Sequence, residues 1–422
     1  MEEKNHLKKA SELLLLFTVA FAALVFSTHT ADPFWTAEQF FFKTAVTFLC
    51  ILYLVRIFVE RQFVVFKTPY NFALAGFMIM NLAGIFAAKN IFAFLGTVYL
   101  NGCYIILFYF TLDYVSDEEK NLKKMLTAII APSVLMAIYG MLQSGGIDFV
   151  PWQTNFSYRA ASTLGNPNFL AGHMVLIIPV VYAFLPGLGK VKRLGMLLTA
   201  LILTAALAFT QTRGAYIAYA VSIVILFLLL LKYDADNMKK YGKGVMVLFL
   251  ALMVSGMAYF TVNKNARERV INLVSLKDKD AEIRAKMWIN TIYLIKDNFI
   301  LGSGAGNFAG KYSYYQSKAL NAEDFRSNEY YRTGHAHNDL LQFIAEYGAA
   351  GAGFMFLFLG LIFYNGGRAL GKGAEDRYLS AGLIAAEAGL LMHGMFNFPF
   401  IIIPTTAVFY ALAAAAAVTQ DD

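Results

Sequence analysis

The sequence predicts an all-α protein that crosses a membrane about 12 times, and its composition and its apolar segments carry that prediction. Hydrophobic residues make up 58% of the 422 residues and charged residues only 15%, against roughly 45–50% and 25% in a typical soluble protein. The mean hydropathy of +0.55, with 38 Phe and 24 Tyr, fits long apolar segments with aromatic rings at the bilayer edges. This composition argues against a water-soluble fold.

Twelve segments have the length that a membrane span requires, or approach it. A helix needs about 20 apolar residues to cross a hydrocarbon core of about 30 Å. The segments are residues 11–27, 40–59, 69–88, 91–112, 122–142, 167–186, 192–210, 214–232, 243–262, 339–364, 378–395 and 399–418. We interpret the first as a retained span, because no small-residue cleavage site follows it.

The basic residues predict the orientation of these spans. With the N-terminus in the cytoplasm, six inner stretches hold 19 of the 35 Lys and Arg, the short outer segments hold four, and residues 263–338 hold the other 12. Cytoplasmic segments carry the excess of Lys and Arg in membrane proteins. We therefore expect both termini inside and one long outer segment at 263–338. The net charge of +7 then encodes orientation and does not indicate nucleic-acid binding.

This topology divides the chain into four parts. They are helices one to five at residues 1–142, helices six to nine with an outer loop at 143–262, the outer segment at 263–338, and helices ten to twelve at 339–422. In the outer segment, four apolar residues at spacings of four and three predict an amphipathic helix over about 281–299. They are Trp288, Ile292, Ile295 and Phe299. The glycine-rich stretch at 302–306 lacks the Lys-Ser/Thr of a nucleotide loop, and we interpret it as a flexible hinge.

The strongest local constellation is the run Gly334–Asp339, which contains His335 and His337 directly before a long apolar segment. Histidine has an unperturbed pKa near 6.5, so it takes and returns a proton near neutral pH. A pair of solvated loop histidines, or a His-x-His metal chelate, explains the same residues about as well as catalysis does. A metal is the weaker alternative, because no other His or Cys lies nearby in the sequence.

Three arginines lie at the expected outer face: Arg159, Arg213 and Arg284. A guanidinium stays charged and presents a planar fork of donors that suits phosphate oxygens. Arg213 is the most informative, because it sits in a tight connection between two apolar segments, and a charge at the membrane centre costs about 2.5 to 3.5 kcal/mol. A snorkelling side chain is the alternative for Arg213. Ordinary surface charge is the alternative for the other two.

The run Ser162–Asn168 opens the sixth apolar segment. Pro167 suits the first position of a helix, and Asn166 suits the capping position before it. Helix capping is a sufficient explanation for these residues taken alone.

Together these motifs resemble the O-antigen ligase and polymerase superfamily and the bacterial protein O-oligosaccharyltransferases that share its domain. The similarity covers about residues 155–400. Its motifs are Arg-x-x-Ser-Thr-Leu-Gly-Asn-Pro-Asn at 159–168, Thr-Arg-Gly at 212–214, Arg284 and Trp288 ahead of Leu-Gly-Ser-Gly at 301–304, and His337-Asn338 followed after nine residues by Gly-Ala-Ala-Gly at 348–351. The resemblance implies a membrane glycosyltransferase that moves a glycan from an undecaprenyl-diphosphate carrier to an acceptor hydroxyl at the periplasmic face, without a metal or nucleotide.

Carried onto this sequence, the resemblance makes His337 the candidate general base and makes Arg213 and Arg284, with Arg159, ligands of the leaving diphosphate. In such a scheme the base accepts the proton of the attacking hydroxyl while the arginines stabilise the departing charge, and direct displacement inverts the anomeric centre. Supporting residues are Asn338, His335, Asn166 and Asn168. We expect His393 to act in helix packing.

The same resemblance implies a multi-pass protein of the bacterial inner membrane with its active face in the periplasm. The expected partners are the undecaprenyl-diphosphate-linked donor, a glycan, lipid A core or protein acceptor, and membrane lipids, with no cofactor, metal or nucleic acid. A polysaccharide polymerase and a protein O-oligosaccharyltransferase are alternatives within the superfamily. A lipid-linked sugar transporter or flippase would need ionisable groups at the membrane midplane, of which Glu387 is the main example. A non-catalytic sensor of lipid-linked sugars is a further alternative.

Overall fold

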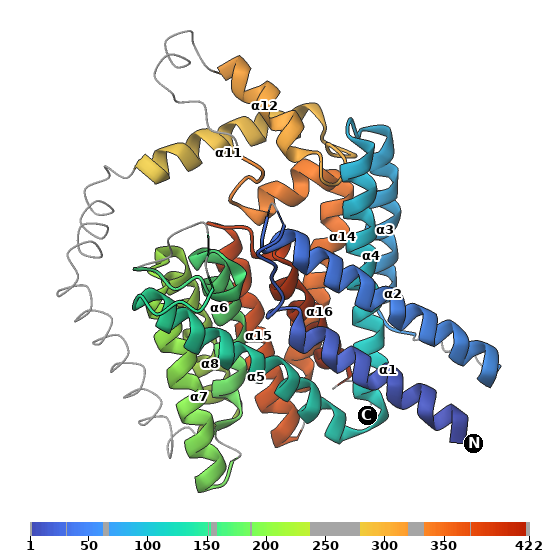
Figure 1. The fold of residues 1–422 in the computed structure, drawn as a ribbon, viewed down its shortest axis with the longest axis vertical. Coiled ribbons are helices and arrows are strands. Elements are labelled where there is room, and N and C mark those ends of the chain that lie inside the picture. The colour runs from blue at the N-terminus through green and yellow to red at the C-terminus, as the bar shows by residue number, and fades with distance from the viewer. Residues whose placement is uncertain are drawn as a thin grey trace.

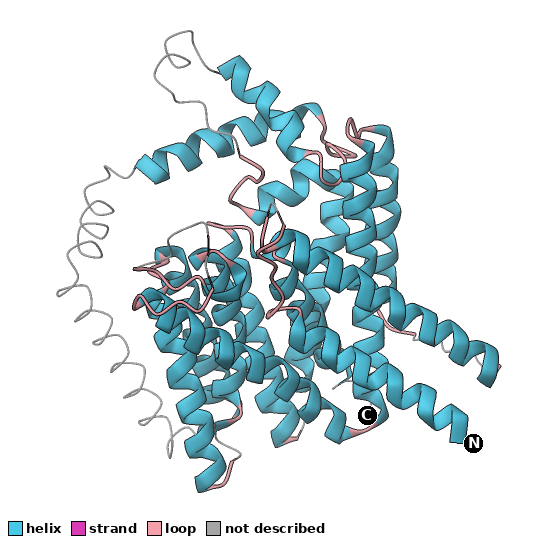
Figure 2. Ribbon diagram, viewed as in Figure 1, coloured by secondary structure: helices cyan, strands magenta, loops and turns pink. Residues whose placement is uncertain are grey.

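The computed structural model describes residues 2–30, 32–61, 67–150, 152, 158–185, 188–236, 279–319, 333–371 and 373–418. Within those ranges every regular element is a helix, and Figures 1 and 2 show the helices joined by loops. The all-α prediction is therefore confirmed for the described part of the chain.

Six of the described helices are long and apolar enough to cross a membrane. They are α2 (Trp35–Glu60), α4 (Ile91–Asp117), α5 (Glu119–Ser144), α7 (Lys190–Phe209), α8 (Arg213–Tyr233) and α14 (Asp339–Ala369). Each coincides with an expected span, which fits a helical membrane protein. The total of twelve stays a prediction, and the expected span at 243–262 lies outside the described residues.

The other described helices are shorter or more polar. They are α1 (Glu2–Phe21), α3 (Tyr70–Ala83), α6 (Pro167–Ala183), α11 (Lys279–Asp297), α12 (Phe308–Ala319), α15 (Ala374–Gly394) and α16 (Ile403–Val418), with 3-10 turns η1 (Gly84–Phe86), η2 (Ser162–Leu164) and η4 (Pro399–Ile401). Helices α6 and α16 are buried along almost their whole length. A helix that is apolar on all sides belongs in the interior of a bundle, so these two form its core.

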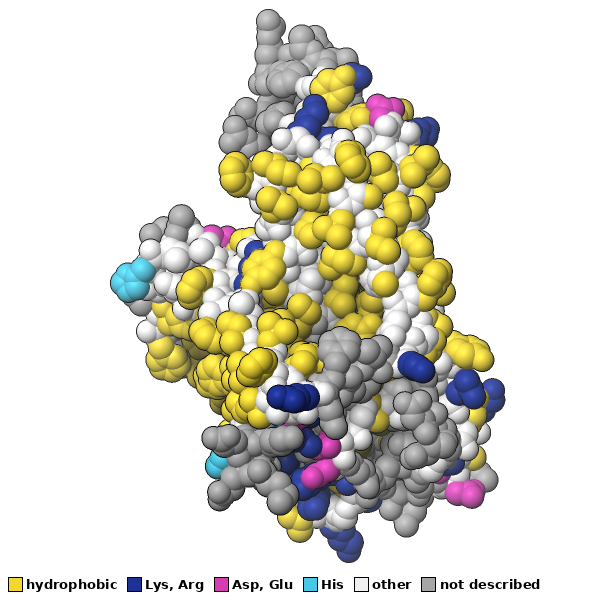
Figure 3. Space-filling view, turned by 90° about the vertical axis from the view of Figure 1, so that its right-hand side faces the viewer, with side chains coloured by type: hydrophobic (Ala, Val, Ile, Leu, Met, Phe, Trp, Pro, Cys, Tyr) yellow, Lys and Arg dark blue, Asp and Glu magenta, His cyan; other side chains and the backbone are white. Residues whose placement is uncertain are grey.

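The helices pack in two groups. Helices α6 and α8 pack against α15, with α5 and α7 beside α6, and α2, α3 and α4 pack around α14 and α16; we call these the α15 group and the α14 group (Figure 1). Figure 3 looks at the side of α3 and α4, where hydrophobic side chains cover the middle and Lys and Arg gather mainly towards the two ends. This distribution suits a surface that faces lipid hydrocarbon.

A pair of glycines joins the loop before α12 to the middle of α14. Gly348 has a φ of +67° and kinks α14, and Gly302 has a φ of +72°. A Cβ on Gly348 would lie 2.0 Å from the carbonyl oxygen of Ile300, and a Cβ on Gly302 would lie 2.4 Å from that of Glu346. Only glycine permits both the backbone conformation and this approach. The stretch that we expected to be a flexible hinge is therefore a tightly packed joint.

Helices α11 and α12 lie at the end of the bundle away from both chain ends (Figure 1). On α11, Met287 and Leu294 are buried, whereas Ile292 is 42% exposed and Phe299, beyond the helix end, is 58% exposed. The expected helix is confirmed over Lys279–Asp297, and Ile292 and Phe299 of the expected stripe lie outside the face that packs on the protein. The reason is that α11 packs on α12 through a face that also contains the polar, buried Asn290.

Candidate active site

The backbone that carries the two histidines is held from both sides at Ala336. The N–H of Ala336 donates to Oε1 of Gln342 at 2.7 Å, and its carbonyl oxygen accepts the indole N–H of Trp288 at 3.1 Å. The next residue, His337, has a φ of +51°, a left-handed conformation that persists in non-glycine residues only where the surroundings enforce it. Helices α11 and α14 together therefore fix the position of His337.

Both imidazole rings lie against the ring of Phe398. His335 stacks on it with centroids 4.5 Å apart and an interplanar angle of 29°, and His337 meets it at 81° with centroids 4.8 Å apart. Burial, and then the positive charge of Arg284, lower the pKa of His337 to about 4. Burial, and then His337, lower the pKa of His335 to about 4. Both rings are thus neutral at pH 7, and a neutral imidazole accepts a proton.

Asn338 ties the histidine loop to the segment that follows α15. Its Oδ1 caps α14 by accepting the N–H of Leu341 at 3.1 Å, and its Nδ2 donates to the carbonyl oxygen of Met395 at 3.1 Å. The neighbouring Asp339 is buried, and its Oδ2 accepts the N–H of Phe400 at 3.2 Å. Asn338 thus fixes the start of α14 against the segment that follows α15, and its supporting role in the site stays a prediction.

Arg159 braces the starts of α6 and α8. Its Nε donates to the carbonyl oxygen of Thr210 at 2.9 Å, and its Nη2 lies 3.2 Å from both Oδ1 of Asn168 and Oγ1 of Thr212. The Thr212 hydroxyl also donates to the Asn168 oxygen at 3.1 Å. The guanidinium therefore fixes the residues directly before Arg213, and its contact with a diphosphate stays a prediction.

The start of α6 also packs against α15. Asn166 caps α6 by accepting the N–H of Asn168 at 2.9 Å, and Pro167 is the first helical residue, as the sequence predicts. Nε2 of His393 lies 3.3 Å from the carbonyl oxygen of Asn168, and a Cβ on Gly172 would lie 3.0 Å from the His393 ring. His393 is therefore a packing residue between α6 and α15, as expected.

The two remaining arginines flank the same region. Arg213 is the first residue of α8 and is half-buried. Its neighbour Gly214 approaches the segment after α15 so closely that a Cβ would lie 3.2 Å from Cβ of Phe396. Arg284, on α11, is near enough to lower the pKa of His337 through its charge. The segment between α15 and η4 thus joins the α8 start, Asn338 and both histidine rings.

This arrangement suits an anion beside a neutral base. The N-termini of α6, α8 and α14 all lie at this region, and a helix N-terminus carries a partial positive charge that favours phosphate. Arginine forks add full charges. In the described part of the chain, no group of three His, Cys, Asp or Glu is placed to hold a metal ion.

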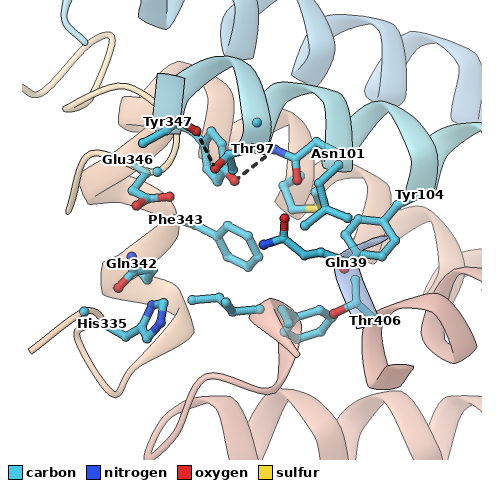
Figure 4. Close-up of a pocket in the computed structure, with 18 of the residues that line it drawn as sticks. Gln39, Thr97, Asn101, Tyr104, His335, Gln342, Phe343, Glu346, Tyr347 and Thr406 are labelled. Carbon is cyan, nitrogen blue, oxygen red and sulfur yellow. Dashed lines mark hydrogen bonds between the residues drawn. The ribbon is translucent and has the colours of Figure 1, made fainter. Parts of the chain in front are cut away.

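A cavity of about 500 Å³ lies beside the histidine loop, among α2, α4, α14 and α16 (Figure 4). Aromatic and aliphatic side chains form most of its wall. Its polar lining residues include Gln39, Thr97, Asn101, His335, Gln342, Glu346 and Thr406. Apart from His335, the sequence gives no sign of these groups, because single amides and hydroxyls in apolar helices follow no recognisable spacing.

A comparison with known protein families finds a match in the part of the chain that holds most of these residues. Residues 198–359 match the family model described as O-antigen ligase. The match includes Arg213, Arg284 and the histidine loop, and it begins after Arg159. No curated protein matches the chain. The resemblance to the O-antigen ligase superfamily is therefore confirmed.

Proposed function

We propose that this protein is a membrane glycosyltransferase of the O-antigen ligase superfamily, and that it moves a glycan from an undecaprenyl-diphosphate carrier to an acceptor hydroxyl at the periplasmic face. One observation carries the proposal. A neutral His337 and two arginines, Arg213 and Arg284, flank one region at which three helix N-termini meet.

The proposed base is His337. The acceptor oxygen attacks the anomeric carbon as the bond from that carbon to the diphosphate oxygen breaks, and the hydroxyl proton passes to the imidazole. Direct displacement inverts the anomeric centre. Burial and the charge of Arg284 lower the pKa of His337, so the ring is unprotonated at neutral pH and able to accept a proton.

The proposed ligands of the leaving diphosphate are Arg213 and Arg284. Charge builds up on the diphosphate as it departs, and donors already fixed in a partly dry site stabilise that charge strongly. Arg159 contributes by holding the α8 start through Thr210 and Thr212. This scheme assigns no step to a metal or a nucleotide.

Purified protein in lipid nanodiscs, given an undecaprenyl-diphosphate-linked oligosaccharide and defined acceptors, tests the proposal. We expect release of undecaprenyl diphosphate and a product of inverted anomeric configuration. A lipid A core, a second lipid-linked glycan and a peptide with Ser or Thr, tested in parallel, separate ligase, polymerase and protein glycosyltransferase. Movement of the intact carrier across a bilayer without cleavage would instead establish a flippase.

The proposed face of the membrane has its own test. Residues 263–338 are expected outside, and only 279–319 and 333–338 of them lie within the described residues. Alkaline phosphatase fused after the exposed Ser317 of α12 should be active, because the enzyme works only after export. An inactive fusion there, with an active cytoplasmic reporter at the same position, would place the site on the opposite face.

A further inference from the structure

A single buried residue, Asn307, ties the turn between α3 and α4 to the start of α12. Its Oδ1 accepts the backbone N–H groups of Lys89 and Asn90 at 3.1 and 2.7 Å. Its own carbonyl oxygen accepts the backbone N–H of Lys311 at 3.2 Å. The backbones of two lysines that are far apart in the chain are therefore held on one residue.

The two lysines have no acidic partner in the described part of the chain. Lys89 is exposed and Lys311 is half-buried. Nζ of Lys311 donates to Oδ1 of Asn298 at 2.9 Å, which is a neutral partner, and neither lysine forms an ion pair with a described residue. Burial, and then the charge of Lys89, lower the pKa of Lys311. Two positive charges thus lie near each other without a counter-charge.

The backbone donors at this corner are already in use. Helices α4 and α12 both begin here, and their N-termini add partial positive charge. Oδ1 of Asn90 accepts the N–H of Ala93 at 3.1 Å, and Oε1 of the buried Glu346 accepts the N–H of Phe308 at 3.3 Å. An anion at this corner would therefore bind to the lysine side chains.

Large apolar side chains lie exposed beside the lysine pair. Phe86 and Phe92, three residues to either side of Lys89, are 88% and 84% exposed, and Phe299 and Ile300 are also exposed. The two segments lie side by side, because a Cβ on Gly304 would lie 2.9 Å from the carbonyl oxygen of Gly84. Contiguous exposed apolar surface of this kind marks a site of contact with a membrane or a partner.

This apolar patch continues the side of the bundle that suits lipid. Helix α4 is long and apolar enough to cross a membrane, and it begins at Ile91, two residues after Lys89. Figure 3 shows hydrophobic side chains along the side of α3 and α4, with Lys and Arg mainly towards its ends. A turn at the end of a span lies at the depth of the lipid headgroups, where aromatic rings and lysines are both favoured. A lipid surface therefore explains the patch better than a protein partner does.

We propose that Lys89 and Lys311 bind the phosphate of an anionic phospholipid, whose acyl chains lie against Phe86 and Phe92, in the leaflet next to α12. A lysine ammonium is a compact charge with three donors on a flexible stem, which suits a phosphate in the headgroup region. A phospholipid supplies the negative charge and covers the apolar rings at the same time. The site is separate from the region of His337 and is independent of the proposed transfer reaction.

Binding is measured by native mass spectrometry on the full-length protein in detergent, with phosphatidylglycerol and phosphatidylcholine of the same acyl chains as probes. The double variant Lys89→Gln with Lys311→Gln should weaken binding of the first phosphatidylglycerol about thirtyfold, at about fivefold for each lysine near an anionic lipid. Its binding of phosphatidylcholine should change little. Asn307 bonds only the backbone of both lysines, so these substitutions leave the joint intact.

The matched control is Lys318→Gln, about two turns further along α12, which should bind phosphatidylglycerol as the wild type does. Equal phosphatidylglycerol binding by the wild type and the double variant would overturn the proposal. Equal affinity of the wild type for both lipids would also overturn it. Inorganic phosphate and undecaprenyl diphosphate are added as competitors, and displacement of the lipid by inorganic phosphate at equal concentration would establish a site for free phosphate instead.

A second measurement places the patch relative to the bilayer without relying on the lysines. Phe86→Trp, in vesicles of phosphatidylglycerol and phosphatidylcholine, should show tryptophan fluorescence that lipids brominated in their acyl chains quench beyond the wild-type level. Tyr314→Trp, at an exposed position on α12, is the control and should add no quenched signal. An unquenched tryptophan at position 86 would place the patch in water and would overturn the proposal in favour of a protein partner.

Discussion

Two neighbouring regions of this protein differ sharply in charge. The proposed reaction region, where Arg213, Arg284 and His337 lie around the segment after α15, combines full positive charges with helix N-termini. The cavity of the α14 group contains amides, hydroxyls and aromatic rings, and none of the described residues that line it is Lys or Arg. The reaction region therefore suits an anion better than the cavity does.

The two regions share the loop that carries the histidines. Gln342 lines the cavity and also accepts the N–H of Ala336, the residue before His337. Phe398 contacts both imidazole rings, of which only His335 lines the cavity. The histidine loop thus lies between the positively charged region and the wall of the cavity. Substitutions in the one region should therefore have effects that can be separated from those of substitutions in the other.

The largest expected effect comes from removing charge in the reaction region. Arg213→Ala should lower turnover of a lipid-linked oligosaccharide by about 10³-fold or more, the usual loss when an arginine that stabilises a departing phosphate is removed. Arg213→Lys should retain part of the activity, because it keeps the charge and loses the fork. Arg284→Ala should act in the same direction, and the double variant should be non-additive because both side chains serve one leaving group.

The control for Arg213 is Lys232→Ala, which removes a positive charge from the opposite end of the same helix. It should leave turnover unchanged. If Arg213→Ala has wild-type turnover at matched expression, Arg213 does not bind the leaving group and is only a snorkelling side chain at the membrane interface.

The next effect concerns the base. His337→Ala should lower turnover by roughly 10²- to 10⁴-fold while the protein stays folded and binds carrier lipid, and EDTA should have no effect on the wild type. His29→Ala, in an exposed loop, is the control. Equal losses in His335→Ala and His337→Ala, with activity abolished by EDTA and restored by a divalent ion, would establish a metal chelate in place of a base.

The acid limb of the pH profile tests the link between His337 and Arg284. Since the pKa of His337 is lowered to about 4, the ring stays neutral until the pH falls through about 4, and kcat/KM should be lost only there. Arg284→Ala removes the nearby positive charge, so the pKa should rise towards the ordinary 6.5 and remain below it because burial persists. NMR titration of labelled histidines, assigned with His337→Ala, measures this without activity. An unchanged pKa of His337 in Arg284→Ala would show that the charge of Arg284 does not act on the His337 ring.

Local features of the site could be predicted from the sequence, because they depend on neighbours in the chain. Apolar runs marked the six long helices, and Asn166 with Pro167 marked the start of α6. The glycine motifs at 302–306 and 348–351 could also be recognised in the sequence, but the contact between them could not. Gly302 and Gly348 are separated by 45 other residues and fit each other only through the backbone, and no periodicity encodes such a contact.

The structure adds the residues that hold the functional groups in place. In the sequence, Trp288 is an apolar position on a helix and part of a family motif, and only the structure shows that its indole N–H donates to the carbonyl oxygen of Ala336. Arg159 has the same side-chain chemistry as the other two arginines, and only the folded arrangement reveals its bonds to Thr210, Asn168 and Thr212. Sequence identifies groups with suitable chemistry, whereas partners distant in the chain decide how each is used.

The smallest expected effect concerns the two hydrogen bonds that hold the backbone of Ala336, one from Trp288 and one to Gln342. Trp288→Phe keeps an aromatic ring and removes the N–H that bonds the Ala336 carbonyl at 3.1 Å. One such hydrogen bond is worth about 1 kcal/mol, so turnover should fall about fivefold, through kcat and not through the KM for acceptor. Ile289→Val, on the exposed face of α11, is the control and should change nothing. Unchanged turnover in Trp288→Phe would show that the bond from Ala336 to Gln342 is sufficient to hold the loop.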